Sequence, residues 1–450
     1  MPHKTQILQV STLYGAATLA AALDAGLFGP RAGVRRVLLV SNNAAIPETA
    51  LRLDEMHGYE AIAARFDSVI SWNDTIAPHH PSVWGPRGND TILWQKAFRL
   101  AWDIDPRDEV ELAVESIQVS PGRALAAIFT ESAVHVYADG LMSYGPTREK
   151  LPLTIARRIR RLLHLDLVPG LRPLLLSEYG VEPEVVPDEA FRAVLDEIAR
   201  DAADDPRLAP VLAEAPTAVL LGQYLAALNI LSPAEEEELH IRMLTGAARA
   251  GHRSVVFKPH PTAPASYSAA LSKAAAEAGV RLTVLDAPLL AETLYRHCRP
   301  TLVVGCFSTA MVTASAYYDI PVARVGTDLV LGRLTPYQNS NRVPLVVIDH
   351  LVPDLERGEA PAPVGAAPES LPPLLRAVGF CMQPKTYAEL REPAADWLRA
   401  HLAGAPGSYF PELRLAELGL PGSGPQARAQ LQVRRAKRVV RRAVRRGARK

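Results

Sequence analysis

The sequence predicts an α/β protein built from two doubly wound parallel-sheet domains that face each other across a cleft. Short apolar segments alternate with longer helical segments, as expected for parallel strands joined by crossover helices. This alternation is interrupted after about residue 150 and starts again near residue 216. The length of 450 residues also exceeds what one ordinary hydrophobic core accommodates. Each of the two domains is therefore expected to be Rossmann-like.

We expect the chain to divide into five parts. They are an N-terminal domain over residues 1–150, an interdomain and capping helical region over 151–215, a C-terminal domain over 216–350, a Pro-rich connection with helices over 351–425, and a basic tail over 426–450.

The N-terminal series begins with a strand over residues 6–10, after which Ser11 and Thr12 can cap a helix that Gly26 ends. The next strand is apolar throughout, which is typical of a parallel sheet covered on both faces. The expected strands are 6–10, 36–41, 68–71 and 134–137. The expected helices are 13–25, one that starts at Pro47-Glu48, 89–101 and 122–130.

The C-terminal series follows a different segment, in which the basic run Arg157–Leu163 is predicted to be helical. Its expected strands are 217–222, 254–258, 281–285, 301–304, 321–325 and 345–348. Its expected helices are 233–250, 266–278, 289–297 and 309–318, followed by helices near 370–380 and 387–402.

Composition narrows the class of protein. The chain is 48% hydrophobic and 22% charged, which is ordinary for a soluble globular protein. Arg, Asp or Pro interrupts every apolar stretch before it reaches membrane-spanning length, and the first ten residues lack the pattern of a secretory signal. The three Cys residues have neither metal nor disulfide spacing. We therefore expect a cytoplasmic protein.

The first motif with chemical potential is Asp139-Gly140, which follows a predicted strand. A carboxylate at a strand's carboxyl end lies at the rim of the expected cleft, where it can take a proton from an incoming hydroxyl as a general base. Asp-Gly is also a common turn pair, so the motif taken alone favours an ordinary turn.

The second motif is Lys258-Pro259-His260-Pro261. Pro fixes its φ angle and lacks an N–H, so the strand must end here in a stiff loop that holds one imidazole at the strand's carboxyl end. The imidazole can donate a hydrogen bond or a proton to a departing phosphate, and Lys258 adds positive charge. A histidine held by the backbone in a rigid loop is an equally good interpretation of this motif alone.

The third motif is Ser308-Thr309, which opens a helix after a predicted strand and Gly305. Free N–H groups and the macrodipole make a helix N-terminus an anion site, although simple N-capping by Ser or Thr is common. Three further sets of polar or small residues follow predicted strands and are candidate ligand contacts. They are Ser11, Thr12 and Gly15, then Asn42 and Asn43 as acceptor-side residues, and Gln223 on the donor side.

Taken together, the motifs resemble those of bacterial sialyltransferases of the glycosyltransferase-B fold, closest to the alpha-2,8-polysialyltransferase family. That family has an acidic-acidic-Gly motif, a His-Pro motif and a Ser/Thr pair. The matching residues in the same order are Asp139-Gly140, His260-Pro261 and Ser308-Thr309. The segments Gln9–Tyr14 and Leu38–Asn43 also look like the family's N-terminal domain, and the resemblance covers roughly residues 5–350.

The resemblance implies an inverting glycosyltransferase that uses CMP-sialic acid or a related CMP-ulosonic acid. Asp139 would be the general base and His260 the general acid or hydrogen-bond donor to the leaving phosphate. Ser308 and Thr309 would hold that phosphate, with Lys258, Pro261 and Gln223 as further donor-side residues. No cofactor and no divalent metal is expected, because His260, Lys258 and the helix N-terminus supply positive field.

The sequence departs from the family motif at one position. Ala138 stands where the family has its first acidic residue, so the motif has one carboxylate. If the residue next to Gly is the base, catalysis survives, whereas if the base is the earlier acid, the chain is inactive or altered in specificity.

The C-terminal tail is strongly basic. Residues 426–450 carry nine Arg and two Lys without an acidic residue, a charge of +11, whereas the remainder carries −10. On a helix, Val433, Ala436, Val440, Ala443 and Val444 form a narrow apolar stripe surrounded by Arg. We expect Arg434–Lys450 to bind an anionic membrane surface at the inner face of the membrane. A solvated tail is the alternative, and nucleic acid is disfavoured because no aromatic residue interleaves with the Arg.

Two other functions stay open from the sequence. The same fold can host a transferase or epimerase that uses another nucleotide sugar. Ala138 also allows a non-catalytic glycan-binding protein.

Overall fold

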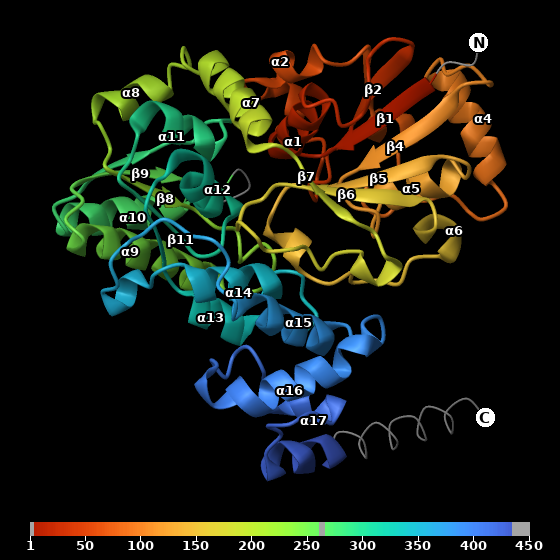
Figure 1. The fold of residues 1–450 in the computed structure, drawn as a ribbon. Coiled ribbons are helices and arrows are strands. Elements are labelled where there is room, and N and C mark those ends of the chain that lie inside the picture. Colours follow the sequence, from red (N-terminus) through yellow and green to blue (C-terminus); the bar gives the residue numbers. More distant parts are fainter. Residues whose placement is uncertain (1–3, 261–265, 434–450) are drawn as a thin grey trace, which may run out of the picture.

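The computed structural model describes residues 4–260 and 266–433 and contains two parallel sheets (Figure 1). The first has the strand order β3-β2-β1-β4-β5-β6-β7 and the second the order β10-β9-β8-β11-β12. Each sheet starts in its middle and is extended in both directions, which is the doubly wound arrangement. The predicted class, two Rossmann-like parallel-sheet domains that face a cleft, is confirmed.

The strands of the first sheet are β1 Lys4–Val10, β2 Val34–Val40, β3 Ser68–Ser71, β4 Glu109–Val114, β5 Ala133–Ala138, β6 Ile159–His164 and β7 Pro183–Val185. The strands of the second sheet are β8 Ala218–Leu221, β9 Ser254–Lys258, β10 Arg281–Val284, β11 Leu302–Gly305 and β12 Val322–Arg324.

The helices that precede the second sheet are α1 Leu13–Asp24, α2 Tyr59–Ala63, α3 Trp72–Ile76, α4 Thr91–Ala101, α5 Gly122–Ile128, α6 Leu153–Ala156, α7 Asp188–Asp201 and α8 Leu208–Ala213. The later helices are α9 Pro233–Arg249, α10 Ser266–Glu277, α11 Ala291–Cys298, α12 Thr309–Tyr318, α13 Thr327–Arg333, α14 Arg342–Leu351, α15 Leu371–Met382, α16 Arg391–His401 and α17 Glu412–Leu418. Short 3-10 helices are η1 Leu53–Glu55, η2 Leu141–Tyr144, η3 Ser177–Tyr179, η4 Leu355–Arg357, η5 Ala388–Leu390 and η6 Leu402–Gly404.

The segment Arg157–Leu163 was predicted to be helical, and this prediction is wrong. Most of it forms β6, which pairs with β5 and β7. One Arg side chain of this run has partners on the neighbouring strands: Arg161 donates to His135 Nδ1 at 2.9 Å and to Glu184 Oε2 at 2.9 Å. The first sheet therefore continues past the boundary predicted at residue 150.

Residues 345–348 were predicted to be a strand, but they belong to helix α14. Its residues 342–348 are all buried, and a short apolar run does not distinguish a buried strand from a buried helix. Helix α14 packs against η2, which immediately follows Asp139 and Gly140. The helix expected at Pro47-Glu48 is also absent, since residues 41–52 form turns and irregular structure.

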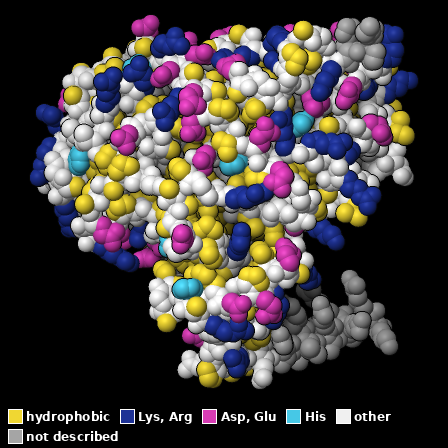
Figure 2. Space-filling view, in the orientation of Figure 1, with side chains coloured by type: hydrophobic (Ala, Val, Ile, Leu, Met, Phe, Trp, Pro, Cys, Tyr) yellow, Lys and Arg dark blue, Asp and Glu magenta, His cyan; other side chains and the backbone are white. Residues whose placement is uncertain are grey.

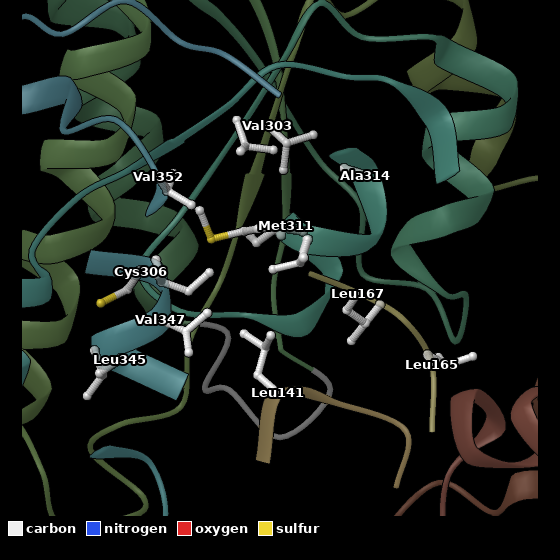
Figure 3. Packing of buried hydrophobic residues seen from close by; sticks show 14 of the residues in the cluster. Leu141, Leu165, Leu167, Val303, Cys306, Met311, Ala314, Leu345, Val347 and Val352 are labelled. Carbon is white, nitrogen blue, oxygen red and sulfur yellow. The ribbon is translucent and has the colours of Figure 1, made fainter. Parts of the chain in front are cut away.

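One hydrophobic cluster connects the two domains. It includes Leu141 and Leu167 from segments that follow β5 and β6, together with Met311 and Val347 from α12 and α14. Figure 3 shows these side chains close to one another. Helix α7 packs against both α1 and α11, so it also joins the two domains. These contacts hold the two sets of strand ends in a defined relation.

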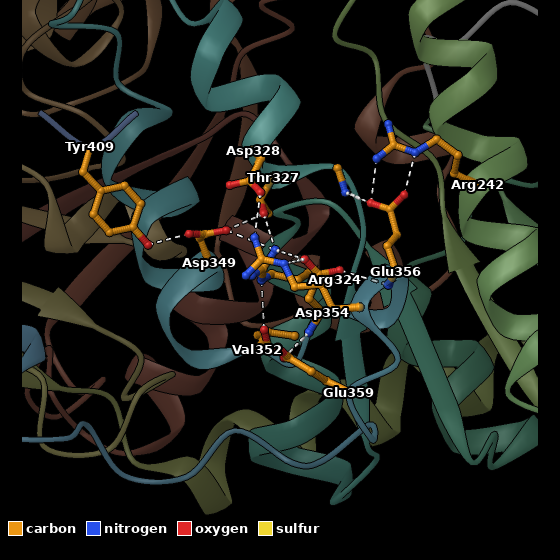
Figure 4. Close-up of polar contacts among 12 residues, drawn as sticks. Arg242, Arg324, Thr327, Asp328, Asp349, Val352, Asp354, Glu356, Glu359 and Tyr409 are labelled. Atoms are coloured by element: carbon orange, nitrogen blue, oxygen red, sulfur yellow. Dashed lines mark hydrogen bonds and ion pairs between the residues drawn. The ribbon is translucent and has the colours of Figure 1, made fainter. Parts of the chain in front are cut away.

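A buried polar network connects the C-terminal segment that contains Tyr409 to the second domain (Figure 4). Arg324 pairs with Asp349 at 3.1 Å and with Asp354 at 3.0 Å, and Tyr409 donates to Asp349 Oδ2 at 2.6 Å. Tyr387, which precedes Tyr409 in the chain, donates to Glu178 Oε2 at 2.7 Å. Glu178 belongs to the first domain, between β6 and β7. The C-terminal helices, drawn in blue below the two sheets in Figure 1, thus contact both domains.

The surface shows no large region of one charge on the face seen in Figure 2, where Lys and Arg alternate with Asp and Glu. None of the helices within the described residues combines the length and hydropathy needed to cross a bilayer. Residues 425–433 are helical. Two predicted features, the membrane-binding segment 434–450 and Pro261, lie outside the described residues.

Candidate active site

A cavity of about 600 Å³ lies between the carboxyl ends of the two sheets. Residues that follow β4 and β5 line it from the first domain, and residues that follow β8, β9 and β11 line it from the second. Of the residues predicted from the sequence, seven line this cavity: Thr12, Asp139, Gln223, Lys258, His260, Ser308 and Thr309.

The Asp139-Gly140 and Ser308-Thr309 motifs meet directly across the cleft. A Cβ atom placed on Gly140 would lie 2.8 Å from Thr309 Oγ1, so a larger residue at position 140 would require the Thr309 side chain to move. Close by, the hydroxyls of Tyr14 in α1 and Thr313 in α12 are hydrogen-bonded at 2.8 Å. The contact brings the acidic motif beside the N-terminus of α12.

Asp139 sits at the end of β5, where the hydroxyl of Thr12 donates to its Oδ2 at 3.5 Å. Burial raises the pKa of Asp139. A second carboxyl, that of Glu115 at the end of β4, lines the same cavity. Burial and the negative charge of Asp139 raise the pKa of Glu115 to about 7. A raised pKa makes a carboxylate a stronger base, which suits proton abstraction.

His260 lies on the opposite side of the cavity, where its ring stacks on Tyr224 at 3.8 Å between ring centroids. Burial and the charge of Lys258 lower the pKa of His260 to about 4. The imidazole is thus neutral at pH 7 in the protein without ligand. Burial also lowers the pKa of Lys258 to about 8, and its Nζ donates to the Ala287 carbonyl at 3.1 Å.

Ser308 is the N-cap of α12 and accepts a hydrogen bond from the Ala310 N–H at 3.2 Å. Ser308 and Thr309 both line the cavity, so the N-terminus of α12 lies at the cavity wall.

Glu292, in the first turn of α11, is 3% exposed and lines the same cavity. Its Oε1 is buried without a hydrogen-bond partner among the described residues. Burial raises its pKa to about 7. An unpartnered acceptor on the cavity wall suits the hydroxyl of a bound ligand.

The other predicted acceptor-side residues do not line the cavity. Ser11 Oγ donates to Glu115 Oε2 at 2.5 Å, and Gly15 lies behind Asp139. Asn42 is hydrogen-bonded to helix α3 and to its own loop: its N–H donates to Asn73 Oδ1 at 2.9 Å and its Oδ1 accepts from the Ala44 N–H. Asn43 follows it and is also outside the cavity lining.

Glu115, Tyr224 and Glu292 are among the cavity residues that sequence reasoning missed. Each directly or closely follows a strand end or opens a helix, but nothing in the local sequence separates them from ordinary loop or capping residues. Within the described ranges 4–260 and 266–433, no group of three or more His, Cys, Asp or Glu is arranged to hold a metal ion. The expectation that no metal is needed stays a prediction.

Comparison with known proteins gives one family match. The model of the family described as "Alpha-2,8-polysialyltransferase (POLYST)" matches residues 6–327. No curated protein matches the chain in sequence.

Several solved structures are similar in fold, at low identity. The sialyltransferase GT-B domain from Photobacterium damselae is 11% identical, with 76% of this chain and 96% of that chain covered and a TM-score of 0.42. S. aureus MnaA, solved with UDP, is 12% identical, with 90% and 99% covered and a TM-score of 0.41. MurG from Acinetobacter baumannii is 12% identical, with 90% and 97% covered and a TM-score of 0.37.

Proposed function

Because the chain belongs to the alpha-2,8-polysialyltransferase family, we propose that this glycosyltransferase moves sialic acid, or a related ulosonic acid, from a CMP-sugar to a glycan acceptor. The observation that carries the proposal is the cavity itself. It places Asp139 of the first domain opposite His260 and the Ser308-Thr309 helix N-terminus of the second.

The second domain offers a site for the donor's phosphate. Ser308 and Thr309 open α12, whose N-terminal N–H groups and macrodipole favour an anion. His260 and Lys258 line the same cavity and add a hydrogen-bond donor and a positive charge. Gln223 lines it at the end of β8. Pro261 remains a predicted donor-side residue.

The first domain offers the base. The acceptor hydroxyl oxygen attacks the anomeric carbon while the bond from that carbon to the phosphate oxygen breaks, and the electron pair leaves with CMP. Asp139 takes the hydroxyl proton. His260 donates a hydrogen bond or a proton to the leaving phosphate. A single displacement of this kind inverts the anomeric configuration.

The membrane part of the proposal rests on composition. The Arg-rich segment 434–450 would attract an anionic leaflet, each basic residue contributing roughly 1 kcal/mol near the surface. We propose that the protein is cytoplasmic and peripheral, and acts at the inner face of the membrane. Sedimentation with anionic vesicles, with and without this segment, tests it: equal binding by both chains would contradict it.

Turnover tests the proposed reaction. We expect the chain to release CMP from CMP-sialic acid when a sialylated oligosaccharide is present, and to leave UDP-N-acetylglucosamine and GDP-mannose unchanged. Because positive side chains and a helix terminus hold the phosphate, we expect the rate to persist in excess EDTA. Turnover of a UDP-sugar would instead support a transferase or epimerase for another nucleotide sugar. Glycan binding without any donor turnover would support a non-catalytic protein.

A further inference from the structure

The two carboxyls of the first domain come from neighbouring strands. β4 and β5 pair in register through Val114 and Val136, Glu115 follows β4, and Asp139 follows β5. Because the carboxyl ends of parallel strands meet at one edge of the sheet, both side chains reach the same part of the cavity. Position 138, which the family motif fills with an acid, is Ala here.

Two consecutive residues after β1, Ser11 and Thr12, donate hydrogen bonds to the two carboxyls. Ser11 Oγ donates to Glu115 Oε2 at 2.5 Å, and the adjacent Thr12 Oγ1 donates to Asp139 Oδ2 at 3.5 Å. A Cβ on Gly15 would lie 3.2 Å from Asp139 Oδ2 and 3.1 Å from Thr12 Oγ1, so the first turn of α1 fits closely behind the pair. The two carboxyls are thus fixed by consecutive hydroxyls at the end of β1.

The groups around the pair are hydroxyls and carboxyls on the first-domain side. Tyr137 donates its hydroxyl proton to the Gln9 carbonyl at 3.0 Å, and Tyr14 is hydrogen-bonded to Thr313. Charged and titratable side chains that line the rest of the cavity are Arg148, Tyr224, Lys258, His260 and Glu292. The electrostatic influences on Glu115 and Asp139 come from burial, from hydrogen bonds and, for Glu115, from Asp139.

We propose that Glu115 and Asp139 form an electrostatically coupled carboxyl pair, in which Glu115 acts on Asp139 through its charge. This inference rests on the proposed function. In the reaction the acceptor O–H bond breaks and its proton goes to Asp139. Glu115 makes and breaks no bond to the substrate, so it is a positioning residue whose negative charge strengthens Asp139 as a base.

The protonation behaviour agrees with this assignment. Two close carboxyls cannot both ionise easily, so the first proton leaves at a lower pH and the second at a higher pH than for an isolated group. Burial and the charge of Asp139 raise the pKa of Glu115 to about 7, and burial raises that of Asp139. The form in which both carboxyls are ionised, and in which Glu115 strengthens Asp139 as a base, is therefore reached as pH rises through about 7.

The kinetic test is the pH profile of kcat/KM for transfer. In Glu115→Gln the neighbouring charge is lost, so we expect the acidic limb to move about one unit lower in pH and the plateau to fall about tenfold, since a weaker base accepts the proton. Glu115→Asp keeps the charge and should keep the limb near its wild-type position. If the acidic limb of Glu115→Gln stays at its wild-type pH, whether or not the rate falls, the proposal is wrong.

Glu111→Gln is the matched control. Glu111 lies on the same strand but binds Lys4 at 3.0 Å and His135 at 2.7 Å, and it does not line the cavity. Removing the Glu111 carboxylate should lower the free energy of unfolding and leave the acidic limb at its wild-type pH. A limb shift of equal size in Glu111→Gln would show that the shift is a general effect of removing a carboxyl, which would also overturn the proposal.

A second readout requires no substrate. A carboxyl whose pKa is raised in the folded state destabilises the fold as pH rises above its unfolded value, and most strongly above its folded value. Between about pH 5 and pH 8, Glu115→Gln should therefore raise the unfolding midpoint of the wild type, and should raise it less in an Asp139→Asn background, where only the burial of Glu115 remains to destabilise its ionised form. Equal effects in the two backgrounds would refute the coupling of the two carboxyls. If the wild type transfers no sugar, the proposed function fails, and this cycle still decides whether the pair exists.

Discussion

The Asp139→Asn variant is expected to lose sugar transfer by about 10²–10⁴-fold while it keeps the wild-type affinity for CMP. Asn has the same shape as Asp but cannot accept a proton from the acceptor hydroxyl. Asp139 lies on the first-domain side of the cavity, whereas the proposed phosphate site is formed by residues of the second domain. The measurement is the initial rate of transfer at saturating donor, together with calorimetric titration of CMP.

A matched control for this variant is Asp166→Asn. Asp166 follows β6 at the same edge of the first sheet, and burial raises its pKa, but it does not line the cavity. It should transfer at close to the wild-type rate. If Asp139→Asn also keeps the wild-type rate, or loses CMP affinity in proportion to rate, Asp139 is not the base and the proposed mechanism is wrong.

The His260→Ala variant is expected to bind CMP about 10–100-fold more weakly, because a hydrogen bond to a charged phosphate contributes about 1.5–3 kcal/mol. Burial and the charge of Lys258 lower the pKa of His260 to about 4 in the protein without ligand. A bound phosphate raises that pKa, so the imidazole takes up a proton on binding and CMP affinity increases as pH falls toward about 5. His260→Ala should lose this pH dependence. Titrations in buffers with different ionisation enthalpies measure the proton uptake.

His252→Ala is the control for that experiment. His252 precedes β9, at the opposite end of the strand that leads to His260, and its Nδ1 is hydrogen-bonded to Thr217 Oγ1 at 3.0 Å. Burial lowers its pKa as well, but it does not line the cavity. CMP binding by His252→Ala should match the wild type. Equal losses of CMP affinity in the two variants would mean that His260 stabilises the fold and does not contact the phosphate.

The sequence was sufficient to predict the fold class and the main features of the cavity. Asp139, His260 and Ser308 each follow a recognisable apolar strand, and the strand ends of a doubly wound domain lie at one edge. Their convergence on one cavity therefore followed from order along the chain. The two strand-helix errors, at Arg157–Leu163 and at 345–348, arose where short buried runs carry no clear period.

Glu115 could not be found in this way. It is separated from Asp139 by 23 intervening residues, and the pairing of β4 with β5 brings both residues to the same edge of the sheet and to one cavity. The sequence does not identify Glu292 as a cavity residue for a different reason. An acidic residue in the first turn of a helix is common, since it interacts favourably with the helix dipole. Its burial and its unpartnered oxygen are properties of the tertiary structure alone.

The measurement that tests the central claim most directly is a calorimetric titration of the wild-type protein with CMP, compared with UMP, UDP and GDP. The account predicts selective binding of CMP, because the proposed donor is a CMP-sugar and the proposed site for its phosphate is the part of the cavity lined by His260, Ser308 and Thr309. Binding of UDP in preference to CMP, or of no nucleotide at all, would contradict the assignment of this cavity to a CMP-sugar.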